Sequence, residues 1–539
     1  MLRRPGWGAA FALFFAAGLG ADPDPADARR AKGYLREVKR HLLESYIDRQ
    51  MLKDADLVAS GLRAMSSALD HKDFAGVGAP ARDAARKAIA DAETLDAAVD
   101  AAAGAAPELD LVLLADHAAR AMVRMTGDPF SRILTQDDFQ KLLKMLQEGS
   151  REEHAGCALQ FDAGKLKVMY VQFGTPAYEE GVEIGDEVLE VGDRRAAEIA
   201  PEELDDLLRL AASGTLELKL RRYGKDYVFR LVPGAGRAGV VRHEYLGQGV
   251  GYLRIAMFDL ALAALVKKAL QDLKGKGMEA LILDLRHNPG GALPAATAVA
   301  DLFLGQDLMI TRTKSFYKPS VGGLRLPGLG GDADYRTKTK SDFESIPMVC
   351  LVNRASASAS ELLAGALQDH RRATLIGETT YGKGVGQTPI FLNSMFMKRY
   401  LYLTVMRYTT PNGNEVDRRG VAPDLESRDA RPTAENFDAR VRLRAGGEIE
   451  KYLAEHWTAE LRKAAVNDAF ETSRYPDFAS WYRKLYRLKP ELTEDEFREE
   501  LRRAARRKIA SEGHLWACDL QTDRALQRGL VELLDRLGR

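Results

Sequence analysis

The spacing of apolar residues divides the chain into stretches of different secondary structure. From residue 27 to 147, apolar side chains recur at helical spacing, as in YLREVKRHLL and LLADHAARAMVRM, with few β-branched runs. From residue 152 to 233, short β-like runs such as LKVMYV and TLELKLRR alternate with glycines and one helical piece, PEELDDLLRLA. The first stretch is predicted to be a helical region, and the second a small β-rich domain.

Strands and helices are predicted to alternate from residue 240 to 428. Strand-like runs such as ALILDLR and IPMVCLVN are apolar enough to be buried on both faces, as in a parallel sheet covered by helices. The Gly- and Lys-rich segment from Lys314 to Asp342 is expected to be an exposed loop inserted in this α/β layer. Residues 432–539 are rich in charged residues and have apolar residues at helical spacing, which predicts a helical extension. The composition does not indicate the role of this extension.

Residues 1–21 have the pattern of a secretory signal peptide. Arg3 and Arg4 form a basic start, residues 9–17 are apolar, and small residues follow. The apolar stretch is shorter than the roughly 20 residues that span a bilayer, and no cysteine follows it for lipidation. We therefore expect export to the periplasm or cell envelope, with no stable membrane span after signal removal. An uncleaved interfacial anchor is the alternative.

Charge and cysteine content exclude some classes of protein. The 539 residues include 78 basic and 78 acidic side chains, and no basic stripe is interleaved with aromatics, so we do not expect nucleic acid as a partner. Cys157, Cys350 and Cys518 are odd in number and scattered, which indicates neither a disulfide framework nor a cysteine zinc site. Cys350 lies in an apolar run and is interpreted as an inert core thiol.

Ser358 is the first candidate for chemistry, because it stands between a strand-like run and a helix-like run in ASASASE followed by LLAGALQDH. With Glu361 it fits the S-x-x-E capping box, so that it could simply cap the helix. The same position suits a nucleophile, since helix N–H groups and the macrodipole stabilise an oxyanion formed there. Position alone does not separate the two interpretations.

Lys383 follows Ser358 by 25 residues in GETTYGKG, which resembles a Walker A loop. Gly384 stands where that loop needs Ser or Thr, and a strand-like run follows instead of a helix, so nucleotide binding is not favoured. A lysine base must be neutral near pH 7, about three units below its usual ~10.4, and burial can supply that shift. A Ser-His-Asp triad lacks its G-x-S-x-G elbow, and His370 lies twelve residues along the helix.

Two further sequence features offer backbone amides or a strand edge that could bind a substrate. The run DLRHNPGG ends a strand with Gly290 and Gly291, whose amides, together with that of Ala359, would suit an oxyanion hole. The alternative is an ordinary strand-ending turn. In the β-rich domain, GTPA followed by GDEVLEVGD resembles the PDZ signature.

The carboxylate-binding loop of a PDZ domain would fall on five successive residues: Ala155, Gly156, Cys157, Ala158 and Leu159. Its backbone N–H groups would bind a terminal carboxylate, and the strand edge beside it would add the peptide as a further strand. Cys157 stands where PDZ domains more often have a large apolar or small residue, which leaves the pocket shape open. A generic β-domain with glycine turns is the alternative.

Together these motifs resemble the C-terminal processing peptidases, also called tail-specific proteases. The resemblance rests on D-L-R-x-N-x-G-G, on S-A-S-E with G-A-L-Q-D, and on G-E-x-T-Y-G-K-G-x-x-Q, and it covers Leu114 to Glu426. It implies a multidomain α/β protein: a crotonase-like protease core with an inserted PDZ domain, a helical N-terminal region and a helical C-terminal extension. The N-terminal region and the extension are longer than the family usually has.

The resemblance also implies the roles of individual residues. The nucleophile is Ser358, chosen over Ser356 and Ser360 by its place in the motif, Lys383 is the general base, and Gln387 helps to hold the lysine. The expected reaction is peptide hydrolysis through an acyl-enzyme, which requires neither a metal nor another cofactor. Protein substrates with apolar C-terminal tails are the expected partners, and an adaptor protein or a homo-oligomer is possible. A catalytically silent PDZ scaffold and a ligand carrier on the same fold are the alternatives.

Overall fold

The computed structural model describes most of the chain beyond the predicted leader. The described residues are 27–148, 155–162, 164–199, 203–208, 214–232, 240–318, 320–321, 324–325, 330–392, 398–428, 432–486, 491–512 and 516–539. The leader predicted over residues 1–21 lies outside these ranges. Among the helices of the described ranges, none combines the length and apolar character needed to cross a bilayer.

The chain folds into two compact units. Met1–Gln136 and Thr388–Leu403 form unit 1, and Asp137–Gln387 and Thr404–Arg539 form unit 2. This grouping differs from the sequence-based division, which placed residues 388–403 with the α/β segment. The reason is strand pairing over a long sequence distance: strand β1 (Arg132–Leu134) pairs antiparallel with the first three residues of β18 (Tyr400–Thr409).

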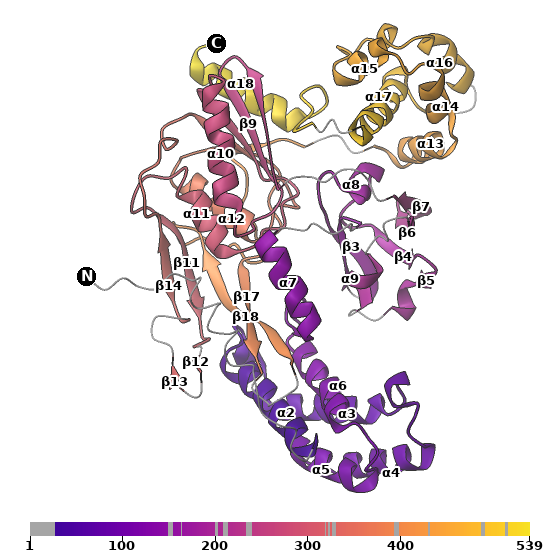
Figure 1. The fold of residues 1–539 in the computed structure, drawn as a ribbon, viewed down its shortest axis with the longest axis vertical. Coiled ribbons are helices and arrows are strands. Elements are labelled where there is room, and N and C mark those ends of the chain that lie inside the picture. The colour runs from indigo at the N-terminus through magenta and orange to yellow at the C-terminus, as the bar shows by residue number, and fades with distance from the viewer. Residues whose placement is uncertain are drawn as a thin grey trace. The chain divides into compact units, whose positions relative to one another are not determined.

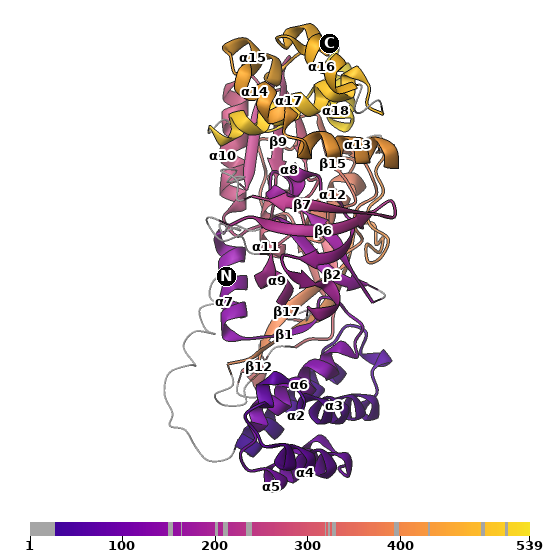
Figure 2. The same ribbon diagram turned by 90° about the vertical axis from the view of Figure 1, so that its right-hand side faces the viewer.

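Helices dominate unit 1, as the periodicity predicts, and they are drawn in indigo in Figures 1 and 2. They are α2 (Asp27–Glu44), α3 (Asp54–Ala68), α4 (Ala79–Ala90), α5 (Leu95–Ala105) and α6 (Leu111–Arg124), with short 3-10 turns η1 (Arg49–Met51) and η2 (Lys72–Phe74). Helix α7 (Gln136–Glu148) follows. Asp116 on α6 is buried, accepts from Tyr34 Oη at 2.8 Å and pairs with Arg120, which fastens α2 to α6.

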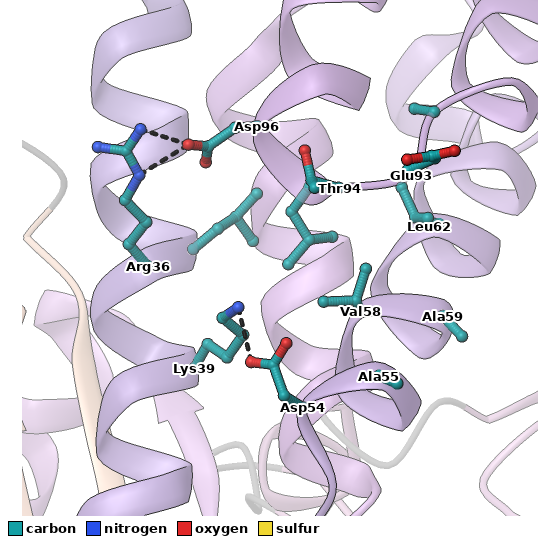
Figure 3. Close-up of a pocket in the computed structure, with 13 residues that line it drawn as sticks. Arg36, Lys39, Asp54, Ala55, Val58, Ala59, Leu62, Glu93, Thr94 and Asp96 are labelled. Carbon is teal, nitrogen blue, oxygen red and sulfur yellow. Dashed lines mark hydrogen bonds and ion pairs between the residues drawn. The ribbon is translucent and has the colours of Figure 1, made fainter.

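A pocket of about 700 Å³ opens between α2, α3 and the turn before α5 (Figure 3). Val58 and Leu62 supply apolar lining. Two ion pairs lie in its wall: Arg36 Nε donates to Asp96 Oδ2 at 2.8 Å, and Lys39 Nζ lies 2.7 Å from Asp54 Oδ1. The pocket contains none of the residues predicted to carry chemistry.

An antiparallel sheet of six strands follows in unit 2, as the β-like runs predict. Its path is β2-β3-β4-β6-β7, with β5 paired to β4, so β2 lies at an edge. The elements are β2 (Cys157–Asp162), β3 (Lys165–Val171), α8 (Pro176–Glu180), β4 (Glu187–Val191), β5 (Arg194–Arg195), η3 (Ala196–Glu198), α9 (Leu204–Leu207), β6 (Leu216–Arg222) and β7 (Lys225–Leu231). Asp186 of the GDEVL motif is buried and accepts from Arg222 Nε at 2.6 Å.

A second six-stranded sheet, here called the central sheet, has the order β19-β16-β15-β10-β9-β8. Only the β8–β9 pair is antiparallel; the other neighbours are parallel. Its strands are β8 (Val241–Gly247), β9 (Val250–Ile255), β10 (Ala280–Asp284), β15 (Met348–Val352), β16 (Thr374–Gly377) and β19 (Leu425–Glu426). Because β10 and β15 are parallel, the loops that follow them meet at one edge, where α/β proteins bind ligands.

Both faces of the central sheet are covered, which explains its uniformly apolar strands. Helices α10 (Leu262–Gly275), α11 (Leu293–Ala300) and α12 (Ala359–Asp369) share one hydrophobic core with one face. Helix α18 (Arg524–Leu537) supplies Leu526 and Leu533 to a separate core on the other face, with Ile282 and Val349. The yellow α18 lies beside the central sheet in Figure 1.

The predicted loop from Lys314 to Asp342 is only partly a loop. Strand β11 (Met309–Ser315) pairs antiparallel with β14 (Ala333–Arg336) and with β18, and the short strands β12 (Ser320–Val321) and β13 (Leu324–Arg325) pair with each other. Strand β17 (Val385–Phe391) joins the same sheet through β18. The sequence prediction was wrong here because strand pairing between distant segments overrides the turn-like composition.

The C-terminal extension is helical, as predicted, and contains a core of its own. Its helices are α13 (Ala434–Ala445), α14 (Glu448–Glu455), α15 (Ala459–Val466), α16 (Phe478–Tyr486) and α17 (Glu494–Ser511), with the turn η5 (Thr472–Arg474) before α16. Phe437 on α13 belongs instead to the core of the β2–β7 sheet, where the Arg222 guanidinium lies 4.4 Å from its ring centroid. The extension therefore packs on the β2–β7 sheet through Phe437 and on the central sheet through α18.

Helix α18 provides a test of this packing. Leu526→Ala should destabilise unit 2 by about 2–5 kcal/mol, because Leu526 is fully buried and its loss leaves a cavity against the central sheet. Val531 on the same helix is 58% exposed, so Val531→Ala should change stability by less than about 0.5 kcal/mol. Urea denaturation followed by circular dichroism compares the two variants. Equal midpoints would contradict the packing.

Candidate active site

Ser358 is the N-cap of α12, directly after β15 and its loop. Its backbone has φ 55° and ψ −115°, whereas an ordinary N-cap residue is extended. A positive φ is uncommon for a residue other than glycine and indicates local strain, of the kind found at functional sites. Ser358 is partly exposed, while Ser356 and Ser360 have no exposed surface.

The two neighbouring serines have structural partners. Ser356 Oγ donates to the Leu285 carbonyl at 2.9 Å and accepts from the Asn353 amide. Ser360 Oγ donates to the Asn288 carbonyl at 2.9 Å. Both hydroxyls thus fasten the serine turn to the loop after β10. Of the three serines in the motif, Ser358 is the one that a substrate could reach.

Lys383 lies between β16 and β17, and the structure contradicts the weaker alternatives for this segment. The element after Lys383 is the strand β17, so the helix of a P-loop does not follow it. His370, the nearest histidine to the serine in sequence, has Nε2 2.6 Å from the Met309 carbonyl. That contact directs its ring to β11. A nucleotide site and a histidine base are both disfavoured.

Glu361 joins the backbone around Ser358 to the backbone around Lys383. It has no exposed surface, and its Oε2 accepts from the amides of Ser358 and Lys383, each at 2.8 Å. Its Oε1 accepts from Thr380 Oγ1 and the Gly382 amide, each at 2.6 Å. Burial raises the pKa of Glu361, and these four donors oppose the rise. The sequence indicated Glu361 only as a capping partner.

Tyr408 on β18 is a second residue that sequence reasoning missed as part of the site. Its hydroxyl is 2.9 Å from the Ser358 carbonyl and also contacts the Lys383 carbonyl. Burial raises the pKa of Tyr408 well above its ordinary value, so the phenol keeps its proton and donates. The residues around Tyr408, in the run RYTTPNG, do not by themselves indicate a contact with Ser358 or Lys383.

Gln387 lies on β17, and its Nε2 donates to Thr404 Oγ1 at 3.0 Å. Thr404 is buried on β18, so the amide plane of Gln387 is fixed by the neighbouring strand. An amide in this arrangement keeps its Oε1 as an acceptor. Strand β18 therefore holds the side chain of Gln387, which follows Lys383 by four residues, in one orientation.

Gly290 approaches the serine turn, and Gly291 approaches the Phe258 backbone, more closely than any other residue type would allow. They have φ 97° and 143°, and a Cβ at Gly290 would lie 2.8 Å from Ser358 Cβ. The Gly290 amide donates to Asn288 Oδ1 at 2.9 Å, so it is already engaged, which is unfavourable to its predicted oxyanion role. Within the described residues, the amides of Gly291 and Ala359 donate to no protein acceptor. These two amides are therefore unengaged where the oxyanion prediction needs donors.

The five residues predicted to bind a substrate tail lead into and form the start of β2. Ala155 is buried and its amide donates to the Leu208 carbonyl at 2.9 Å, while Cys157 belongs to the core beneath the sheet. Burial raises the pKa of Cys157 to about 12, so its thiol is unreactive. Ala158 is exposed, Leu159 is partly exposed, and β2 is an edge strand. Since the Cys157 thiol is in the core, it does not form the surface of a peptide site.

The chain matches known proteins in this region. A profile of Peptidase family S41 matches residues 249–427. The "Carboxyl-terminal-processing protease" of Synechocystis sp. is 31% identical over 313 residues, which are 56% of this chain and 68% of that protein. The protein of the same name from Picosynechococcus sp. is 32% identical over 316 residues, 56% of this chain and 70% of the relative. The chain therefore belongs to the S41 family of C-terminal processing serine proteases.

A solved structure is also similar in fold. The "Photosystem II D1 C-terminal processing protease" aligns with a TM-score of 0.53 at 24% identity, covering 75% of this chain and 94% of that one. At this identity the likeness concerns the fold alone. The resemblance drawn from the sequence motifs is confirmed at the level of the family.

His287, next to the glycine pair, should make stability depend on pH. Its Nδ1 is 2.9 Å from the Val171 carbonyl, which requires a proton on Nδ1, and burial with Arg254 nearby lowers its pKa to about 4. The unfolded value is near 6.5, so the unfolded state binds a proton first and stability falls as pH drops from 6.5 toward 4. We expect a loss of about 1–2 kcal/mol between pH 7 and pH 5.

The variant His287→Asn isolates this effect, since asparagine tolerates the φ of 57° found at this position. Thermal unfolding at pH 7 and pH 5 should show a smaller drop in the variant than in the wild type. His243→Asn serves as the control, because His243 is partly exposed and pairs with Asp272 at the surface. An identical drop in wild type and His287→Asn would contradict the assignment.

Proposed function

We propose that this protein is an exported serine endopeptidase that binds the C-terminal tails of protein substrates and cleaves them with a Ser/Lys dyad. One observation carries the proposal: the same buried carboxylate, Glu361, holds the backbone amides of Ser358 and Lys383 at equal distance. A serine that only capped a helix would need no link to a lysine segment 25 residues on. Family membership supports proteolysis as the reaction class.

In the proposed reaction, neutral Lys383 takes the hydroxyl proton of Ser358, and Oγ attacks a peptide carbonyl. The amides of Gly291 and Ala359 then donate to the developing oxyanion, where the N-terminus of α12 adds a favourable dipole. Lys383 then gives the proton to the leaving amine. In the second half of the reaction, Lys383 takes a proton from water, the water attacks the acyl group, and the proton returns to Ser358 Oγ. Gln387 would present its Oε1 to the Lys383 ammonium formed in each step.

We propose further that the β2–β7 sheet is a PDZ domain inserted before a crotonase-like core. The edge position of β2 supports this role, because a substrate tail can add there as another strand. Residues Ala155 to Leu159 would then take the terminal carboxylate. Protein substrates with apolar C-terminal tails fit such a site. From the leader pattern we also propose export to the periplasm or cell envelope, and an adaptor protein or a homo-oligomer would present substrates there.

Replacing either member of the dyad tests the catalytic proposal. Ser358→Ala and Lys383→Ala should each reduce cleavage of an unfolded substrate with an apolar C-terminus by at least about 10³-fold, because nucleophile and base act as one unit. Binding of the fluorescent substrate tail should stay within about twofold of the wild-type affinity, since neither side chain belongs to β2. Cleavage is followed by gel electrophoresis and tail binding by fluorescence anisotropy.

Ser356→Ala is the matched control for the choice of serine. It removes a buried hydroxyl with two partners, so it should cost roughly 1 kcal/mol of stability while leaving substantial cleavage. Activity that survives in Ser358→Ala but disappears in Ser356→Ala would overturn the assignment. A wild-type protein that binds tails and cleaves nothing would favour the scaffold alternative, and one that binds a small apolar ligand instead would favour the carrier.

Glu361→Gln tests whether the shared carboxylate positions the dyad. Each carboxylate oxygen accepts two hydrogen bonds, so the amide nitrogen of glutamine must face two donors whichever way it is turned. The two hydrogen bonds to that oxygen position are lost, at a cost of about a few kcal/mol. We therefore expect kcat to fall by about 10–100-fold, with little change in tail affinity. Glu378→Gln is the control, because Glu378 lies in the loop that contains Lys383 and its Oε1 is 3.6 Å from Arg428 Nε.

The pH profile of kcat/KM distinguishes positioning from a general loss of folding. If Glu361 aligns the base, its replacement should change the profile as well as the rate, while circular dichroism stays that of the wild type. Full activity in Glu361→Gln would show that the dyad does not depend on this carboxylate.

A further inference from the structure

A cluster of two histidines and one aspartate lies in unit 1, within the helical region that the proposed catalysis does not use. His71 precedes the turn η2, Asp73 lies in that turn, and His117 is on α6. Their side chains are 45%, 30% and 26% exposed, so solvent reaches each of them. Neither the sequence motifs nor the comparisons with known proteins assign a role to these residues.

The potential ligand atoms of the cluster converge. Asp73 Oδ2 is 3.0 Å from His71 Nδ1 and 3.1 Å from His117 Nε2, and all three atoms lie within 4.8 Å of one another. Zinc binds imidazole nitrogen and carboxylate oxygen at about 2.0–2.1 Å, which places neighbouring ligand atoms of a tetrahedral site roughly 3.3 Å apart. Small rotations of these side chains would thus bring the three atoms around one ion.

His71 Nδ1 has two neighbours in Asp73: the backbone amide nitrogen at 3.3 Å and the carboxylate Oδ2 at 3.0 Å. In the neutral tautomer with its proton on Nε2, the Nδ1 lone pair can bind a cation that the carboxylate oxygen also binds.

The surrounding structure holds the cluster together from two separate segments. Phe74, next to Asp73, is buried and anchors the η2 turn, with its ring 6.1 Å from that of His117. The rings of His71 and His117 meet edge to face, with centroids 5.2 Å apart. His117 follows Asp73 by 44 residues, so the fold and not the local sequence creates the cluster.

We propose that His71, Asp73 and His117 form a binding site for a divalent transition metal of the zinc class. Two imidazoles and one carboxylate suit zinc, cobalt or nickel, whereas calcium and magnesium prefer oxygen ligands alone. Three protein ligands leave one coordination position for water. The bound ion joins the turn after α3 to α6 and stabilises unit 1, and it takes no part in the Ser/Lys chemistry.

The test uses the full-length protein without a histidine tag, stripped with a chelator and titrated with Zn²⁺ against a chromophoric competitor. We expect one saturable equivalent. His117→Gln and Asp73→Asn should each weaken it at least 10-fold, and the double variant His71→Gln/His117→Gln should abolish it. His243→Gln is the matched control: His243 also pairs with one carboxylate, Asp272 at 2.8 Å, but no third ligand from the described part of the chain joins them. It should bind zinc as the wild type does.

Cobalt supplies a readout that needs no variant. Co²⁺ added to the stripped wild type should give the intense visible absorption of a four-coordinate site, displaced by one equivalent of Zn²⁺, and saturating Zn²⁺ should raise the midpoint of thermal unfolding. The proposal is overturned if the wild type binds no stoichiometric Zn²⁺. It is equally overturned if binding is unchanged in the folded double variant, or if Co²⁺ shows only the weak spectrum of six-coordinate oxygen ligation.

Discussion

The candidate site depends on a carboxylate that has been removed from water. Burying the Glu361 side chain is costly unless its lone pairs are used, and four donors from two segments use them. Because each donor must stay in place for the burial to be tolerated, the serine turn and the 380–383 segment are fixed together. The positive φ of Ser358 is tolerated for the same reason: the bond from its amide to Glu361 holds the strained turn.

A second buried carboxylate fixes the sheet edge on which that site is built. Asp284, at the end of β10, is fully buried and accepts from Tyr252 Oη at 2.7 Å and from Arg254 at 3.0 Å. Burial alone would raise its pKa, yet Arg254 and Arg286 hold it well below the usual range, so it stays ionised. Arg286 also pairs with Asp523, the N-cap of α18. The glycine loop after β10 and the C-terminal helix thus share one ionic network.

Most helices and buried strands could be predicted from the sequence, because helical spacing of apolar residues and continuous apolar runs can be seen in short stretches of chain. Ser358 and Lys383 could be singled out for the same reason, each standing in a compact motif. Glu361 was visible only as a capping residue, since its bonds to Gly382 and Lys383 cross 21 and 22 residues. The pairing of β1 with β18 and the engagement of the Gly290 amide likewise depend on contacts that no local pattern encodes.

The C-terminal extension shows how far such contacts reach. Its charge and helical period indicated helices but no partner, and the structure divides it between three cores. Phe437 completes the core of the β2–β7 sheet, α13 to α17 enclose their own, and Leu526 and Leu533 cover the central sheet. Each attachment buries aromatic or aliphatic side chains that would otherwise be exposed on charged helices. The extension is therefore an integral part of unit 2, and both the sheet with β2 at its edge and the central sheet that leads into the serine turn are packed against it.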